Sequence, residues 1–152
     1  MPAMAKVTLH RLSGAKKALD ACRLVEQLYL GGTRVVVWIA DAGRAAVFDE
    51  YLWTFAQNSF VPHRLWNGKG NADDPVVVVT GSLGNPNDAK ALVIVDRLAD
   101  PTVATAFAEI HDFMTPTPQD EAKEETWERA GFTVQEAGAK AQAERNTETL
   151  ID

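Results

Sequence analysis

The chain has 152 residues, of which 46% are apolar, so it is long enough to bury one hydrophobic core. Its net charge of −6 at pH 7 argues against a nucleic-acid-binding surface, because such surfaces usually carry an excess of bases. The acidity is concentrated in residues 115–152, which hold nine acids and four bases. The preceding residues sum to −1, so we expect a nearly neutral folded body.

The cysteine count and the hydropathy of the sequence indicate in which cellular compartment we expect the protein. Cys22 is the only cysteine, so no intramolecular disulfide can form and nothing indicates an oxidising environment. The first residues lack the apolar core of a signal peptide, and no stretch approaches eighteen apolar residues. We therefore expect a cytoplasmic protein without a membrane segment.

The first half of the chain alternates strand and helix patterns. Residues 6–12 alternate apolar and polar side chains as a short strand does, and Ser13 can cap a helix over residues 14–30 that ends at Gly31-Gly32. Residues 33–40 form a near-continuous β-branched run typical of a strand buried on both faces, and Asp41 can cap a second helix. The order strand–helix–strand–helix predicts a parallel sheet begun by a right-handed βαβ unit.

The second half supplies more buried strands. Residues 75–80 and 91–95 are apolar runs bounded by turn-rich loops, a helical turn is expected after Asp100, and residues 108–114 fit one more strand. A last helix is expected over residues 119–130, ending at Gly131. We predict a single α/β domain over residues 1–134 and a surface helix or frayed tail over residues 135–152. The domain is a three-layer, mostly parallel doubly wound (Rossmann-like) sheet of about five strands with helices on both faces.

The glycine-rich loops do not have the spacing of a phosphate site. The Gly68-Lys69-Gly70 run lacks the spacing of a P-loop. The loop over residues 81–88 follows a strand, but it lacks the third glycine of a dinucleotide loop and no helix clearly follows it. Ordinary turns are the favoured interpretation, and a nucleotide-binding α/β enzyme stays an alternative that nucleotide binding at this loop would support.

Side chains that carry chemistry are scattered. His10, His63 and His111 have no cysteine or paired carboxylate at ligand spacing, so the sequence predicts no metal and no cofactor. His111 and Asp112 are adjacent in a predicted strand, which places them on opposite faces. Cys22 falls on the apolar stripe of the first helix, where a core thiol is the simplest interpretation. We therefore expect no catalytic site.

The most informative segment covers residues 48–63 and reads FDEYLWTFAQNSFVPH. Pro62 forces Val61 into an extended conformation, so Phe60 and Val61 cannot continue the helix that ends near Trp53. Two large aromatics in a connecting loop fit either the edge of a core or the anchors of a protein interface.

This segment resembles the pattern LDxxLWxxxxxSFxPH of the chi subunit family of DNA polymerase III. Weaker similarity to the same family extends over residues 77–96, 107–114 and 130–132, so the resemblance covers roughly residues 5 to 134. It implies a non-catalytic scaffold that binds the psi subunit of the clamp loader and the acidic C-terminal tail of single-stranded-DNA-binding protein. In the family the aromatic residues of this pattern face psi, which implies a psi-binding site at Trp53 and Phe60 with Leu52, Val61 and Pro62.

The expected tail-binding site departs from the family. The resemblance implies cations on the last helix beside an apolar slot, for which this chain offers Lys123 and Arg129 with Met114 and Trp127 as walls. Acids occupy most other polar positions of that helix. It is therefore either a tail site, a solvated acidic helix, or a helix whose role has passed to bases elsewhere, for which the candidates are Lys16, Lys17, Arg64 and Lys69.

The sequence thus predicts an accessory subunit that links the clamp loader to single-stranded-DNA-binding protein during DNA replication by tethering, without touching DNA. The first alternative is a diverged chi-like adaptor that keeps the Trp53/Phe60 surface but does not bind the tail. The second is the nucleotide-binding enzyme.

Overall fold

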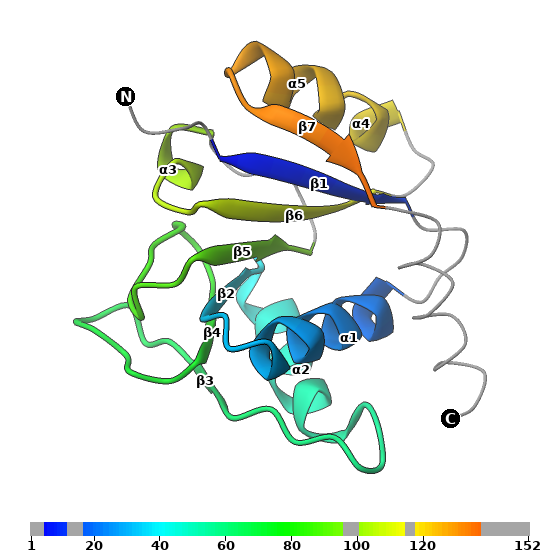
Figure 1. Ribbon diagram of the computed structural model, residues 1–152. Helices are drawn as coiled ribbons and strands as arrows, with labels where there is room; N and C mark the ends of the chain where they lie inside the picture. Colours follow the sequence, from blue (N-terminus) through cyan, green and yellow to red (C-terminus); the bar gives the residue numbers. More distant parts are fainter. Residues whose placement is uncertain (1–4, 12–16, 96–100, 115–117, 138–152) are drawn as a thin grey trace.

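The computed structural model describes residues 5–11, 17–95, 101–114 and 118–137. Its sheet contains seven strands in the order β3-β4-β2-β5-β6-β1-β7, and every pair is parallel (Figure 1). The strands are β1 (Lys6–Arg11), β2 (Val35–Trp38), β3 (His63–Leu65), β4 (Val76–Val79), β5 (Ala91–Ile94), β6 (Glu109–Met114) and β7 (Thr133–Glu136). The predicted α/β class with a parallel sheet is confirmed.

Helices cover both faces of the sheet, which gives the three expected layers (Figure 1). One face carries α1 (Lys17–Leu30) and α2 (Ala42–Thr54), and the other carries α3 (Pro101–Ala104) and α5 (Lys123–Arg129), which α4 (Pro118–Glu121) precedes. Along β2 the buried side chains alternate between the two layers: Val35 and Val37 pack beneath α1 and α2, and Val36 and Trp38 face the other layer. This double burial explains why the central strands are continuous apolar runs.

The described residues that were predicted to begin or end helices do so in the structure. Asp41 caps α2, and its carboxylate accepts a hydrogen bond from the backbone N–H of Arg44 at 2.8 Å. Gly32 and Gly131 have φ of 84° and 96° and end α1 and α5 with paired backbone bonds that reach three and five residues back. These are Schellman caps, which require the left-handed conformation that glycine adopts without strain. The proposed Ser13 cap lies outside the described residues.

The sheet has seven strands, more than the five or so that the sequence predicts. The two unpredicted strands are β3 and β7, which are short edge strands with several exposed residues and therefore lack the apolar runs that marked the central strands. The two strands of the first βαβ unit, β1 and β2, are separated in the sheet by β6 and β5. The expected last helix is divided, because a turn at Ala122 separates α4 from α5.

Strand β7 also bears on the predicted division of the chain. It crosses the boundary between residues 134 and 135, pairs with β1, and is followed by a bond from the backbone N–H of Ala137 to the carbonyl of Leu9 at 2.8 Å. Backbone hydrogen bonding to β1 therefore continues to Ala137, one residue beyond the end of β7. Residues 138–152, the rest of the predicted tail, lie outside the described residues.

Candidate protein-interaction surface

The predicted psi-binding residues lie at the end of α2 and in the segment that follows it. They form two groups, one buried and one exposed. The apolar face of α2 turns Leu52 into the core, and Val61 is buried beside it because Pro62 extends the chain toward β3. Trp53 and Phe60 instead reach the surface, with 43% and 67% of their areas exposed, and Pro62 is partly buried between these groups. Leu52 and Val61 therefore support the surface, and Trp53 and Phe60 form it.

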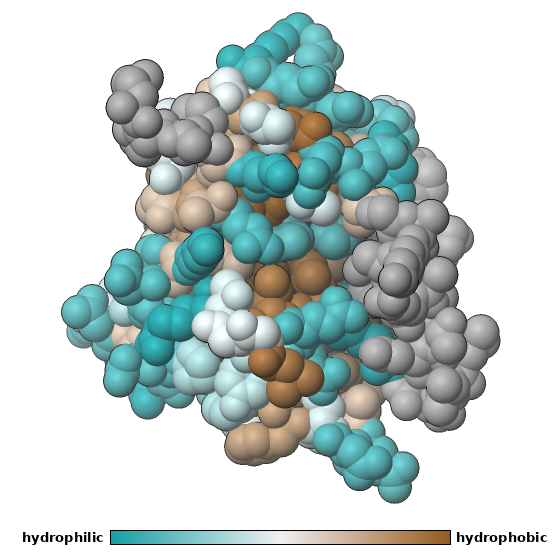
Figure 2. Space-filling view, in the orientation of Figure 1, coloured by the Kyte–Doolittle hydropathy of each residue, from teal (hydrophilic) through white to brown (hydrophobic). Residues whose placement is uncertain are grey.

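The two exposed aromatics belong to a ring cluster with His63, which we call the aromatic patch (Trp53, Phe60, His63). The rings of Trp53 and Phe60 are 5.7 Å apart between centroids, and those of Trp53 and His63 are 3.9 Å apart. Such contacts orient the rings and limit their freedom before any partner binds. Apolar side chains also reach the surface over the region of α1 and α2, bordered by polar groups (Figure 2).

His63 forms the buried part of the aromatic patch. Its side chain is buried, and its two ring nitrogens face the carbonyl oxygens of Val61 and Asp49, each at 2.7 Å. The carboxylate of Asp49 lies 3.4 Å from Nε2. The histidine of the pattern thus joins α2 to the loop and holds Trp53 in place.

The residues predicted for tail binding are arranged differently. Met114 and Trp127 are buried in the core layer beneath α5, and Lys123 is only 2% exposed. Of the four candidates, Arg129 alone reaches solvent, where it forms an exposed ion pair with Glu125 one turn earlier. The expected apolar slot between Met114 and Trp127 is therefore closed in this structure, because both side chains fill the interior.

Lys123 is buried because it serves a polar network inside the protein. Its ammonium donates to Asp112 Oδ1 at 2.8 Å and to the carbonyl of Phe113 at 3.0 Å, with Asp120 at 3.6 Å. Trp127 Nε1 donates to Asp112 Oδ2 at 3.0 Å. Burial raises the pKa of Asp112, and the ammonium of Lys123 opposes that shift. We call this group the buried network (Asp112, Lys123, Trp127).

The other basic candidates that the structure describes lie on different elements from α5. Arg64 Nε donates to Asp74 Oδ1 at 2.7 Å, Lys69 lies in the turn that Asn67 closes, and Lys16 falls outside the described residues. Lys17 lines a cavity at the start of α1. The described bases of this set thus lie on α1 (Lys17), on β3 (Arg64) and in the loop after β3 (Lys69).

The glycine loops are turns, as expected. Gly81 has φ of 71°, and its carbonyl accepts a hydrogen bond from Trp38 Nε1 at 2.9 Å. The loop over residues 81–88 leads into β5 and not into a helix, so it lacks the helix N-terminus on which a dinucleotide loop places phosphates. The loop therefore offers the nucleotide-binding alternative no support.

Sequence reasoning missed a pair of histidines that neighbouring strands bring together. His10 Nε2 and His111 Nδ1 are 2.9 Å apart, and His111 Nε2 lies 2.6 Å from Glu109, whose pKa this contact lowers. The two residues are far apart in the chain, and their meeting depends on the pairing of β1 with β6. Among the described residues no group of three or more potential ligands is arranged to hold a metal ion. His111 and Asp112 point to opposite faces and Cys22 is buried in the core, as expected, and this burial raises the pKa of the Cys22 thiol.

The fold and this surface define an all-parallel α/β domain with an exposed aromatic patch. Among solved structures, the chain resembles the C-terminal domain of Dbp5 from S. cerevisiae at a TM-score of 0.55 and 15% identity, over 97% of this chain and 98% of that one. It also resembles the C-terminal domain of a Sulfolobus solfataricus SWI2/SNF2 ATPase at a TM-score of 0.53 and 13% identity, over 75% and 56% of the two chains. These similarities concern the fold alone.

The family follows from sequence comparison. Residues 4–141 match the family described as DNA polymerase III chi subunit, HolC, and the chain belongs to that family. Relatives are the chi subunits of Pseudomonas aeruginosa, 29% identical over 64% of this chain and 66% of that protein, and of Escherichia coli, 30% identical over 61% and 63%. A probable chi subunit of Rickettsia prowazekii is 32% identical over 48% and 44%. The aligned region thus spans less than two thirds of each of these relatives. The resemblance seen in the sequence is confirmed.

None of the helices in the described part of the chain is long and apolar enough to cross a membrane.

Proposed function

We propose that the protein is a non-catalytic accessory subunit of DNA polymerase III that joins its assembly through the aromatic patch. The partner is the psi subunit or an equivalent clamp-loader component, and the setting is DNA replication in the cytoplasm. Family membership supports the assembly, and the exposed ring pair of Trp53 and Phe60 carries the assignment of the surface. A rigid, partly exposed aromatic pair loses little conformational entropy on binding, which is the property of interface anchors.

The partner that fits this patch has an apolar groove or helix face with few charges. Phe60 would supply most of the newly buried apolar area, and Leu52 and Val61 beneath it resist movement because they are buried in the core. The mechanism would be tethering, in which one bound surface raises the local concentration of whatever a second surface holds.

The decisive experiment measures binding of the purified full-length protein to the psi subunit or clamp-loader component of the same organism by calorimetry. Phe60→Ala and Trp53→Ala should each weaken binding about 30-fold or more, as expected of a central aromatic anchor. Val103→Ala is the matched control, because Val103 is an exposed apolar residue of α3 on the opposite layer. Parent-like affinity in both aromatic variants would contradict the proposal that the aromatic patch binds the partner.

The second proposal concerns the tail of single-stranded-DNA-binding protein. The buried positions of Met114, Lys123 and Trp127 favour the alternative of a diverged chi-like adaptor that does not hold the tail on α5. Titration of the protein with the C-terminal tail peptide at low and high salt distinguishes a tail-binding subunit from the diverged adaptor. Saturable, salt-sensitive binding that Arg129→Glu abolishes supports the tail site, and no binding at millimolar peptide by the folded protein supports the diverged adaptor.

A further inference from the structure

The aromatic patch alone is too small to form a stable protein interface. Trp53 and Phe60 are 43% and 67% exposed, and an aromatic side chain carries about 150–250 Å² of surface, so the two rings together offer a partner about 165–275 Å². A specific interface of standard size buries about 800 Å² on each partner. A partner that binds the patch must therefore cover neighbouring surface as well.

A shallow hollow connects the aromatic patch with a deeper cavity along α2. The hollow has a volume of about 520 Å³, and its lining includes Trp53 of the patch together with Val47 and Tyr51. Val47 and Tyr51 also line an apolar cavity of about 510 Å³ between α1 and α2. Val47 lies six residues before Trp53, about 9 Å along the helix. The surface is therefore continuous from the patch to the cavity.

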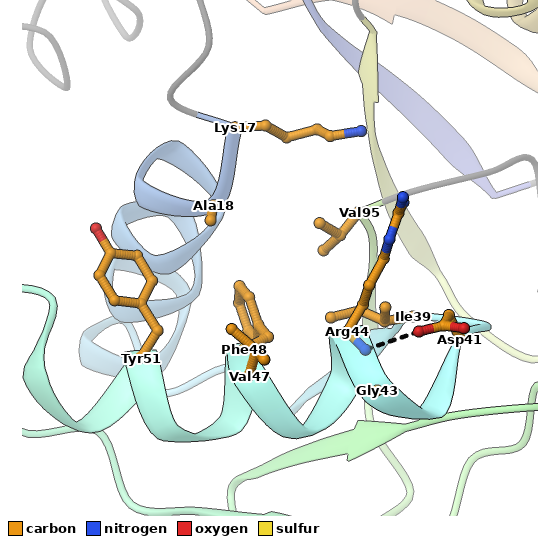
Figure 3. Close-up of a pocket in the computed structure, with 10 residues that line it drawn as sticks. All are labelled: Lys17, Ala18, Ile39, Asp41, Gly43, Arg44, Val47, Phe48, Tyr51 and Val95. Atoms are coloured by element: carbon orange, nitrogen blue, oxygen red, sulfur yellow. Dashed lines mark hydrogen bonds between the residues drawn. The ribbon is translucent and has the colours of Figure 1, made fainter.

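The cavity opens at the carboxyl edge of the sheet and has apolar walls. Figure 3 shows Phe48 and Tyr51 of α2 facing Ala18 of α1 across it. Ile39 and Val95, which follow β2 and β5, form its back wall. The space suits a large aliphatic or aromatic side chain, because such walls offer contacts to apolar atoms from several sides.

The outer face of α2 carries few charges for a helix at the surface. Of its exposed residues, Arg44 and Glu50 are charged, and Val47 is 70% exposed. The other exposed residues of α2 are Ala42, Gly43, Ala46, Trp53 and Thr54. A helix whose outer face contacts only water usually presents charged and polar side chains there. The small residues of this face also let a second helix pack at an interaxial distance of about 8–10 Å.

A helix is the form of partner backbone that suits this surface. The surface consists of the side chains of α2 and, at the cavity, of α1, and it offers no strand edge. An extended peptide would find no backbone groups to pair with there, whereas a helix pairs its own N–H and C=O groups.

We propose that the partner segment that covers the aromatic patch is an amphipathic helix that continues along α2 and inserts one large apolar side chain into the α1/α2 cavity. Its apolar residues would recur at positions i, i+3 or i+4, and i+7, the spacing of helices that lie in grooves. The inference rests on the proposed function, because one partner must cover both the patch and the cavity.

The first test measures binding of the full-length protein to the psi subunit or clamp-loader component of the same organism by calorimetry. Ala18→Trp fills the cavity from α1 and leaves the core intact, because Ala18 is exposed. Val47→Glu places a charge on the cavity rim. Each variant should weaken binding about 10-fold or more. Val103→Glu, on α3 in the opposite layer, is the matched control and should bind like the parent, and circular dichroism checks that all variants are folded.

A second test shows whether the contact at the cavity is direct. Val47→Cys is labelled with a benzophenone maleimide and irradiated in the presence of the same partner. Cys22 is buried, and the parent protein treated with the same reagent checks that it is not labelled. Cross-links are expected within one helical segment of the partner, and Val103→Cys labelled in the same way should give none.

The outcomes separate this inference from the proposed function. Weakened binding in Phe60→Ala with parent-like binding in Ala18→Trp and Val47→Glu would overturn the inference and leave the proposed function intact. Parent-like binding in both Phe60→Ala and Trp53→Ala would contradict the proposed function and the inference together. Weakened binding in Val47→Glu but not in Ala18→Trp would contradict the inserted side chain, and the absence of cross-links from Val47→Cys would contradict the contact itself.

Discussion

Two tryptophans near helix C-terminal ends have opposite environments. Trp127 on α5 is 0% exposed and donates its indole N–H to a buried carboxylate, whereas Trp53 on α2 is 43% exposed and contacts the rings of Phe60 and His63. Both were candidate site residues in the sequence. The difference shows that an aromatic in an amphipathic helix supports an interface only when the tertiary structure leaves it without a covering layer.

When the buried network is compared with the aromatic patch, the largest loss of stability is expected for a substitution in the buried network. Lys123→Met should destabilise the protein by about 3–5 kcal/mol, because it leaves the Asp112 carboxylate buried without its charged partner. Urea unfolding followed by circular dichroism measures the loss. Lys123→Met combined with Asp112→Leu should recover part of it, and a loss below about 1 kcal/mol for the single variant would contradict the buried position of Lys123.

Trp127→Phe tests the same region with a smaller change. It keeps the ring in the core but removes the N–H that Asp112 Oδ2 accepts, so a loss of about 1–3 kcal/mol is expected. The matched change Trp53→Phe, on the exposed aromatic patch, should cost less than about 0.5 kcal/mol. Equal losses of stability in the two variants, measured by the same denaturant titration, would contradict the predicted difference between the buried and the exposed tryptophan.

Arg129→Glu should have a small effect on stability, within about 0.5 kcal/mol, because its ion pair with Glu125 is exposed. Thermal unfolding at low and high salt gives the measurement, and the difference between parent and variant should shrink as salt is added. A larger, salt-independent loss would mean that Arg129 contributes to packing.

Phe60→Ala is expected to change stability least, within about 0.5 kcal/mol, since its ring packs mainly on Trp53 at the surface. Denaturant unfolding of the isolated protein provides the measurement, with Phe107→Ala as a buried control that should lose about 3–5 kcal/mol. A loss of more than about 2 kcal/mol for Phe60→Ala would place its ring in the core and weaken its assignment as an interface anchor.

The sequence by itself determined the class of fold and most of its parts. Runs such as Val76–Val79 predict strands buried on both faces, and Gly32, Asp41 and Gly131 mark helix ends by backbone chemistry that acts within a few residues. The pattern at residues 48–63 also identified the family, and Pro62 predicted an extended conformation at Val61. These signals are local, so no long-range contact is needed to interpret them.

Only the tertiary structure decided which of those residues are exposed. The edge strands β3 and β7 depend on pairing with distant partners, and the meeting of His10 with His111 depends on β1 lying beside β6. Lys123 was expected on the surface because lysines usually lie there, yet Asp112, eleven residues earlier on β6, draws its ammonium inside. Burial is a property of how layers pack against one another, and a single chain read residue by residue does not specify which face of a helix the next layer covers.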